Sequence, residues 1–377
     1  MDPFASGSSN LAAAAAAAAA ETAGPSSRSS TAADHSGPMP THRQKAAAAA
    51  AETRALFPSI PRLSGTDPTS YFYPLTTPLP RMPESARFRL RSAVLEGDFF
   101  DIAVDWQAYM FPDASGATAG ERAPPCFFEN AGVGVATKRI AVLNTCSEKK
   151  AGGDWEGGFL GLGAEESLSR RSNLVQCLTT TDPRSPHVTS YYPIPQTGGI
   201  YSPNTVVLRG GHEKDYALYD ERDWTVLSVI SASAVRKPKV DETGMRYSFA
   251  EEKELQKEKM KTILRIAAQN GHINLVLGGF GSCGPGIGSC RIGIGADGCL
   301  TETPGQHGHP AEHTTPPRSQ ALSAATSSYK NPIKDVCKLW KELLFDDPEF
   351  RGYFANVVFA VSGGESGGQR EFRKYFG

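Results

Sequence analysis

A short apolar segment, a glycine-rich loop and a helical pattern follow one another at 140–178, and this order restricts the fold more than any other feature. Residues 140–144 are apolar up to the final asparagine, which is typical of a buried strand. Residues 165–178 place Leu168, Val175 and Leu178 at helical spacing. A strand that passes through glycines into a helix is the basic unit of a layered α/β fold.

The same alternation continues along the chain. β-branched or apolar segments bounded by polar turns predict further strands, and periods of three to four residues predict further helices. We expect strands at 205–209, 225–231, 273–280 and 356–361, and helices at 46–56, 251–269, 335–344 and 370–376. Strands that alternate with helices favour an α/β fold with a largely buried sheet.

Two segments stand apart from this pattern. Residues 1–40 consist mainly of Ala, Ser, Gly and Pro and have nothing to bury, so we expect disorder there. Thr41-His42-Arg43-Gln44 has the capping-box pattern and begins one domain, 41–377, with a helical extension at its start. Residues 288–329 are rich in Thr, Ser, Pro, Gly and His, which predicts a flexible insertion or a lid.

Composition excludes several classes of function. The 377 residues carry 39 Lys and Arg against 40 Asp and Glu, so no overall positive charge attracts nucleic acid or an anionic membrane. No apolar run reaches the length of a membrane span, and no secretory signal begins the chain. Seven scattered cysteines form no disulfide framework, which favours reduced thiols in the nucleus or cytoplasm.

The loop at 152–163 has the properties of an anion-binding site. Glycines let the main chain approach a ligand closely, and the following helix presents free N–H groups at its N-terminus. Ligands of open α/β sheets bind where strands deliver their C-terminal ends. No Gly-Lys-Ser/Thr follows, so a nucleotide triphosphatase of the Walker type is not expected. A phosphorylated ligand fits this loop, and we expect the stretch from Gly152 to Arg171 to be the active site.

Glu165 and Glu166 occupy the first turn of the helix that follows this loop. Acidic residues at that place complement the helix dipole and need no function. Directly after a glycine loop, however, one of two adjacent carboxylates is suited to general acid chemistry, while the other orients substrate hydroxyls.

A second glycine loop follows the predicted strand at 273–280. Gly279, Gly281 and Gly284 satisfy G-x-G-x-x-G, but no helix clearly follows, so the match to a dinucleotide fold is weak. Two glycine loops at strand ends suit a ligand that carries more than one phosphate.

Several other residue groups are better explained by packing than by chemistry. The histidines and cysteines between 283 and 313 match no usual zinc spacing, so we expect no metal. Cys146 and Cys177 are expected to be core thiols, and Arg170-Arg171 a solvated helix face. The tyrosines are expected either to pack or to provide a stacking surface for adenine. The residues in question are His307, His309, His313, Cys283, Cys290, Cys299, Tyr191, Tyr192 and Tyr201.

From about residue 42 to the end, the chain resembles the microbial-type poly(ADP-ribose) glycohydrolase family in one collinear order, and we expect it to be a fungal member. The resemblance rests on Gly152-Gly153, Gly157-Gly158-Phe159-Leu160 and Glu165-Glu166-Ser167-Leu168, and on matching pieces elsewhere. These pieces are Glu52-Thr53-Arg54, Tyr191-Tyr192-Pro193, Ile200–Pro203, Val206–Arg209, Ile263–Ala268, Leu275–Gly281 and Val357–Val361.

The resemblance implies a macrodomain-like fold, three-layer α/β/α with a central mixed sheet and an ADP-ribose cleft at the strand ends. It implies a glycosidase-type hydrolase without a cofactor. The bond cleaved is the O-glycosidic bond between riboses of poly(ADP-ribose), or the ester of ADP-ribose on a protein. The protein is expected to be a monomer that binds ADP-ribosylated proteins but neither nucleic acid nor membranes, and to act in the DNA damage response.

The same resemblance assigns the site residues. Glu166 matches the catalytic acid and Glu165 its hydroxyl-orienting partner, and Asn144 and Ser147 lie near a polar position that contacts the ribose. The remaining ligand-binding positions fall on the two loops. These are Gly152, Gly153, Gly157, Gly158 and Phe159 on the catalytic loop, and Gly279, Phe280, Gly281, Ser282, Cys283 and Gly284 on the diphosphate loop.

Three departures leave the substrate open. Asp154-Trp155-Glu156 interrupts the glycine triplet, Ala164 replaces a glutamine, and Pro285-Gly286-Ile287 replaces an aromatic. Loss of the amide favours mono-ADP-ribose substrates. A macrodomain-like reader that binds ADP-ribose without cleaving it is the main alternative, since the interruption favours it while the paired glutamates favour an enzyme. A Rossmann-fold dehydrogenase is a third possible function.

Overall fold

A computed structural model describes residues 42–111, 139–157, 163–283, 329–361 and 367–377 of the chain. The disorder predicted for 1–40 concerns residues outside this set. So does the predicted flexible insertion at 288–329, apart from Tyr329. None of the described helices is long and apolar enough to cross a membrane.

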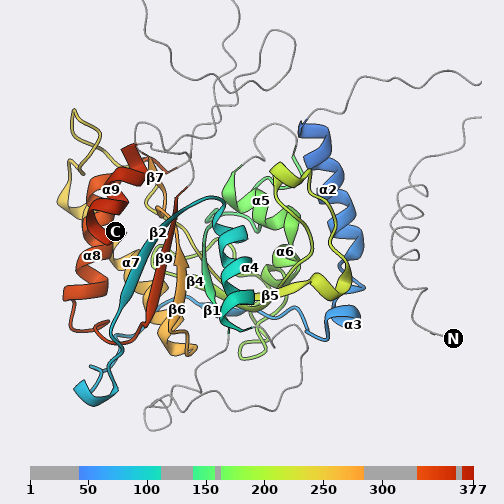
Figure 1. Cartoon of the computed structure of the whole chain (residues 1–377), viewed down its shortest axis with the longest axis horizontal. Coiled ribbons are helices and arrows are strands. Elements are labelled where there is room, and N and C mark those ends of the chain that lie inside the picture. Colours follow the sequence, from blue (N-terminus) through green and yellow to red (C-terminus); the bar gives the residue numbers. More distant parts are fainter. Residues whose placement is uncertain (1–41, 112–138, 158–162, 284–328, 362–366) are drawn as a thin grey trace, which may run out of the picture.

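Within the described residues, seven strands form one mixed sheet in the order β1-β4-β5-β3-β6-β9-β2 (Figure 1). β5, β3, β6, β9 and β2 run parallel to one another, whereas β4 is antiparallel to both β1 and β5. The strands are β1 (Tyr71–Tyr73), β2 (Arg91–Glu96), β3 (Ala141–Thr145), β4 (Gly199–Val207), β5 (Thr225–Ala232), β6 (Asn274–Leu277) and β9 (Asn356–Val361). A separate pair joins β7 (Ser282–Cys283) to β8 (Asn331–Pro332).

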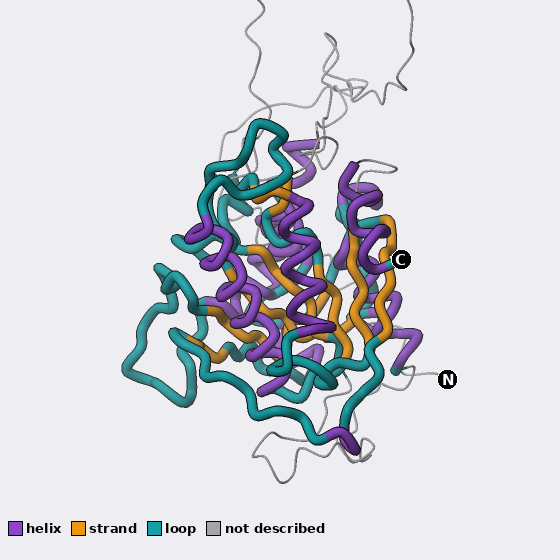
Figure 2. The backbone as a smooth tube through the Cα atoms, turned by 90° about the vertical axis from the view of Figure 1, so that its left-hand side faces the viewer, coloured by secondary structure: helices purple, strands orange, loops and turns teal. Residues whose placement is uncertain are grey.

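Helices cover both faces of the sheet (Figure 2). The α-helices are α2 (His42–Leu56), α3 (Ile60–Ser64), α4 (Phe99–Met110), α5 (Ala164–Arg171), α6 (Leu174–Leu178), α7 (Ala250–Gln269), α8 (Ile333–Lys341) and α9 (Gly367–Phe376). A π-helical turn η6 (Glu342–Asp346) continues α8, and short 3-10 turns are η1 (Glu84–Ala86), η4 (His212–Lys214) and η5 (Glu221–Asp223).

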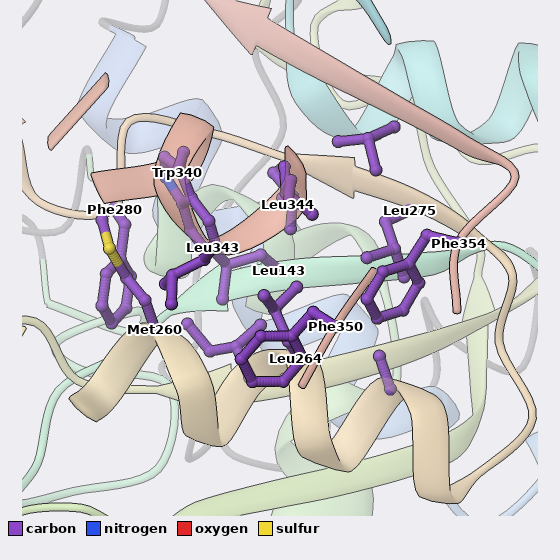
Figure 3. Close-up of a cluster of buried hydrophobic side chains, with 14 of the residues drawn as sticks. Leu143, Met260, Leu264, Leu275, Phe280, Trp340, Leu343, Leu344, Phe350 and Phe354 are labelled. Carbon is purple, nitrogen blue, oxygen red and sulfur yellow. The ribbon is translucent and has the colours of Figure 1, made fainter. Parts of the chain in front are cut away.

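Alternate residues of the central strands enter two different cores. Ala141 and Leu143 of β3 join the cluster built with α7, α8 and α9, while Val142 joins the cluster built with α4, α5 and α6. In β6, Leu275 and Val276 divide in the same way, because successive side chains of a strand point to opposite faces. Figure 3 shows Leu143 near Leu264 of α7 and Leu343 of η6, and Leu275 beside Phe354. The predicted three-layer α/β/α fold with a mixed sheet is confirmed.

The predicted helix at 165–178 is wrong in one respect, because it is broken after Arg171. Ser172 forms an isolated antiparallel bridge with Val207 of β4. The side chain of Asn173 accepts a hydrogen bond from the main-chain N–H of Val206 at 2.8 Å. These two residues therefore bond to β4, and α5 and α6 become separate helices.

The prediction that Arg170-Arg171 forms a solvated helix face is also wrong. Each of these arginines is only 1% exposed. Arg171 pairs with Asp98, at 2.8 Å, and with Asp101, both at the start of α4. Its guanidinium lies 5.2 Å from the ring centre of Phe100. A basic doublet at a helix end thus joins α5 to α4, which the sequence pattern around it does not indicate.

Most other predicted elements are present with shifted ends. The strand predicted at 273–280 ends at Leu277, because the main chain turns at Phe280 and Gly281, which have φ values of 38° and 76°. The helix predicted at 335–344 passes into η6. The sequence analysis missed β1, β2, α4, the short helix α3 and the two-residue strands β7 and β8. Of these, β2 is an edge strand whose half-exposed residues show no clean alternation.

Candidate active site

The catalytic loop, residues 146–163, leaves the C-terminal end of β3 at the centre of the sheet and enters α5. Its first half is a series of tight turns, in which Gly153 N donates to Lys150 O, Trp155 N to Gly152 O, and Gly157 N to Asp154 O. Gly152 and Gly153 have φ values of 71° and 57°, in a region of main-chain conformation that residues other than glycine rarely adopt. The glycine pair is therefore required by the turn itself.

Glu165 is buried at the floor of this loop. The residue is only 5% exposed, and its Oε2 accepts a hydrogen bond from the main-chain N–H of Ser147 at 2.7 Å. Burial, assisted by the charge of Glu166, raises the pKa of Glu165 to about 8, although N–H groups of Ser147 and Gly152 oppose the shift. At neutral pH this carboxyl is held largely protonated.

Glu166 lies one residue further and is partly exposed, so it is the more accessible carboxyl of the pair. Burial raises its pKa as well, and the nearby Asp154 carboxylate adds to the rise. Its own N–H, that of Asp154 and the charge of Arg170 lower it. Oε1 of Glu166 accepts from Asp154 N at 3.4 Å. An accessible carboxyl with a raised pKa is the group that general acid catalysis requires.

Two glycines enclose the Glu166 carboxylate. A Cβ built on Gly153 would lie 2.6 Å from Oε1, and one built on Gly163 would lie 2.3 Å from Oε2. Both distances are too short for real carbon atoms. The main chain of the loop therefore approaches the carboxylate more closely than any side-chain-bearing residue would permit.

Gly153→Ala is expected to lower kcat by about tenfold or more, because the new methyl group displaces the Glu166 carboxylate. The positive φ adds a loss of about 1 kcal/mol in the free energy of unfolding. Gly65→Ala is the matched control, since Gly65 has φ 66° and no atom within 4 Å of its built Cβ. Thermal unfolding and steady-state kinetics of both variants separate strain from displacement: equal kcat values for the two would refute the argument.

The diphosphate loop, residues 278–283, leaves β6, which is the parallel neighbour of β3. Both loops therefore emerge at the same edge of the sheet. Tyr329 contacts both loops. Its hydroxyl donates to Cys146 O in the catalytic loop, and a Cβ built on Gly281 of the diphosphate loop would lie 2.9 Å from the Cβ of Tyr329. Asn331 N donates to Gly281 O at 2.9 Å, which pins the loop to β8.

Phe280 does not present its side chain to a ligand. It is 1% exposed and its ring lies 6.3 Å from that of Trp340 in the core, so only its main chain remains for binding. Gln256 donates to its carbonyl oxygen at 3.0 Å, which fixes the turn. Two residues further, the hydroxyl oxygen of Ser282 is buried and has no hydrogen-bond partner among the described residues.

The other predicted site residues have different outcomes. Ser147 lies at the site and holds Glu165, whereas Asn144 is 0% exposed, bonds Ser231 at 3.0 Å, and lies beneath it. Gly279 lies close to Ser282, since a Cβ built on Gly279 would be 2.1 Å from the hydroxyl oxygen of Ser282. For Cys283 the structure describes only the main chain, in β7. Gly158, Phe159 and Gly284 lie outside the described residues.

Two tyrosines near the site have clearer roles than the sequence indicated. Tyr329 was not predicted, since it ends a segment without periodicity. The hydroxyl of Tyr192 is buried without a described partner, and burial, together with the nearby Cys146 and Glu165, raises its pKa. By contrast, Tyr191 and Tyr201 are buried packing residues.

Potential metal ligands do not gather in the part of the chain that the structure describes, where no three of His, Cys, Asp and Glu converge. Cys146, Cys177 and Cys337 are free and buried, as expected for core thiols in the case of the first two. The zinc-related prediction for His307, His309, His313, Cys290 and Cys299 concerns residues outside that part.

The segment of the chain that matches a known protein family includes the catalytic loop. Residues 127–210 match the model of the microbial-type PARG catalytic domain, PARG being poly(ADP-ribose) glycohydrolase. The resemblance to this family is confirmed. The matched segment contains β3, the catalytic loop, both glutamates and β4. Among curated proteins, none matches the chain.

Solved structures of bacterial PARG have the same fold. The PARG of Thermomonospora curvata is 18% identical with a TM-score of 0.54, over 88% of this chain and 99% of that one. The same enzyme bound to the inhibitor ADP-HPD is 19% identical with a TM-score of 0.53, over 87% and 98%. The fold therefore extends across nearly the whole of the bacterial chain, far beyond the segment that matches the family model.

Proposed function

We propose that this protein hydrolyses the ribose–ribose O-glycosidic bonds of poly(ADP-ribose), with Glu166 as general acid and base. The observation that carries the proposal is a pair of carboxyls with raised pKa values, the buried Glu165 and the partly exposed Glu166, beside a glycine loop in the segment that matches the PARG catalytic domain. The inhibitor-bound PARG of the same fold supports a ligand of the ADP-ribose class.

The chemistry follows from the two protonation states of Glu166. Its raised pKa keeps a proton available, which passes to the leaving ribose oxygen as the glycosidic C–O bond breaks and the sugar becomes oxocarbenium-like. Water then forms the new bond to C1, and Glu166 takes a proton from that water. The start of α5 favours the ionised form, so burial has to outweigh the helix dipole.

The surrounding groups position the substrate. Ser147 N holds Oε2 of Glu165, and a Cβ built on Gly153 would lie 3.1 Å from this oxygen and 2.6 Å from Oε1 of Glu166. We therefore expect Glu165 to orient the ribose hydroxyls beside Glu166. In the diphosphate loop, main-chain N–H groups are the donors that we expect to bind oxygen atoms of the diphosphate. Together these contacts would hold the scissile bond at Glu166.

Ester-linked ADP-ribose on proteins is the second substrate that we propose. Ala164, in place of a glutamine, leaves no amide beside the glutamates, and the residue is exposed. A smaller set of polar contacts suits a single terminal ADP-ribose better than a polymer. The three free thiols also suit a reducing compartment, the nucleus or cytoplasm, as the place of action.

Incubation of the full chain with labelled poly(ADP-ribose) and, separately, with mono-ADP-ribosylated protein tests these proposals. Chromatography of the products is expected to show free ADP-ribose from both, with mono-modified protein cleared at least as fast as polymer is shortened. Faster polymer shortening would overturn the mono-ADP-ribose preference alone. Tight binding of both substrates without release of ADP-ribose would identify a reader instead of an enzyme.

A further inference from the structure

Trp155 is the central residue of the Asp154-Trp155-Glu156 interruption in the catalytic loop. Its side chain is not solvated, because Trp155 is only 2% exposed. It packs in a small apolar cluster with Ala50 of α2 and Val175 of α6. A large side chain that a glycine loop does not need for its turns is therefore fully buried beside the catalytic glutamates.

The surface on which this ring packs is formed by the C-terminal end of α2 and by Phe57, the residue that follows α2. Phe57 stacks with Trp155 at 6.2 Å between ring centres and 21° between planes, and the Arg54 guanidinium lies 5.4 Å from the indole. Arg54 also pairs with Glu156 at 2.7 Å. Both members of this ion pair are about half exposed, so the apolar packing of the indole contributes more than the charges.

α2 is itself fixed to the body of the protein (Figure 1). Thr53 donates from its hydroxyl to Arg170 O of α5 at 2.7 Å and accepts from Arg209 Nε at 3.0 Å. Arg209 also pairs with Glu52 at 2.7 Å while it is only 4% exposed itself. The helix on which Trp155 packs, α2, is therefore hydrogen-bonded to α5, the helix whose first turn contains Glu165 and Glu166.

The indole is linked through the main chain to the carboxyl of Glu166. Trp155 N donates to Gly152 O, and a Cβ on Gly152 would lie 3.0 Å from the indole Cδ1. The preceding residue, Asp154, donates its N–H to Glu166 Oε1 at 3.4 Å. Any outward movement of the indole would move the N–H group and the Gly153 main chain that enclose the carboxyl.

We propose that Trp155 is a positioning residue: seated on α2, it holds the loop at 152–157 against the carboxyl of Glu166. The inference rests on the proposed hydrolase activity and adds to it a role for the N-terminal helix. In this account the inserted residues Asp154-Trp155-Glu156 make the position of the catalytic loop depend on α2 and Phe57.

Trp155→Ala, Trp155→Phe and Phe57→Ala in the full chain test this role. For Trp155→Ala and Phe57→Ala we expect kcat to fall by about tenfold or more, with the affinity for free ADP-ribose within about threefold of wild type. The alkaline limb of the kcat–pH profile is expected to move to lower pH, because a loosened loop hydrates Glu166. Trp155→Phe keeps an aromatic ring on this surface of α2 and Phe57 and is expected to recover most of the activity.

Phe376→Ala supplies the matched control for lost core packing. Phe376 lies in α9 and its ring is 4.1 Å from that of Phe359, in a cluster separate from that of Trp155. It is expected to lower the Tm while leaving kcat and its pH profile unchanged. If Trp155→Ala does not fold, Trp155→Phe and Phe57→Ala decide the question.

The proposal is overturned if the variants at Trp155 and Phe57 keep the wild-type kcat, or lose activity only in step with Tm and without a change in the pH profile. Those outcomes presuppose active wild-type protein. Absence of hydrolysis by the wild type would instead refute the proposed function itself, so the two failures are distinguishable.

Discussion

Glu166→Gln is expected to lower kcat by about 10²- to 10⁴-fold, the usual contribution of a general acid and base. The amide keeps the size of the side chain and its contact with Asp154 N but has no proton to deliver to the leaving oxygen. Affinity for free ADP-ribose should stay within about threefold, because we propose that the diphosphate binds the loop at 279–282 and not Glu166. Rates of ADP-ribose release under saturating substrate, together with calorimetric binding of ADP-ribose, measure both quantities.

Glu251→Gln is the matched control for this variant. Glu251 also occupies the first turn of a helix, α7, but it is exposed and no glycine loop covers it. If acids in a first helical turn act only through the helix dipole, the two variants will behave alike in activity. A loss confined to Glu166→Gln supports the catalytic role, and a fully active Glu166→Gln protein would remove it.

Glu165→Gln is expected to stabilise the fold at neutral pH while it impairs hydrolysis. At pH 7 the folded carboxyl, with a pKa of about 8, is mostly protonated, whereas the unfolded one, with a pKa of 4.5, is ionised. The folded state thus binds more protons between these two values, and the stability of the wild type falls as pH rises through that window. Each pH unit is worth about 1.4 kcal/mol, so a neutral amide should add on the order of 3 kcal/mol at pH 7.

Denaturant unfolding of wild type and Glu165→Gln at several pH values between 4 and 8 measures this difference. The gap in the free energy of unfolding should be small near pH 4 and widen towards pH 8. A gap that does not vary with pH would show that the folded carboxyl has an ordinary pKa. The combination of higher stability and lower activity would identify Glu165 as a buried group retained for function.

The sequence was most informative where local pattern and tertiary structure agree. The buried strand, glycine loop and paired glutamates at 140–166 are recognisable because the turn needs glycine and the core needs apolar residues. β2 was missed because an edge strand with exposed, charged ends lacks the alternation on which such predictions depend.

Residues whose roles depend on distant partners were not predictable in the same way. Arg171 has the composition of a solvated helix end, yet Asp98 and Asp101, some seventy positions away, bury it. Tyr329 reaches Cys146 across 183 positions, and Trp155 packs on α2 and Phe57. Phe280 was assigned to the ligand by its place in a glycine loop, whereas its ring enters the core. Such contacts are fixed by the packing of the layers and have no local signature.

A crystal structure of Glu166→Gln bound to a two-unit fragment of poly(ADP-ribose) tests the central claim most directly. The side-chain amide of residue 166 is predicted to lie within about 3.2 Å of the oxygen that joins the two riboses. The diphosphate is predicted to lie against the loop at 279–282. A fragment bound with its glycosidic oxygen out of reach of residue 166, or bound elsewhere on the protein, would contradict the assignment of Glu166 as the catalytic acid.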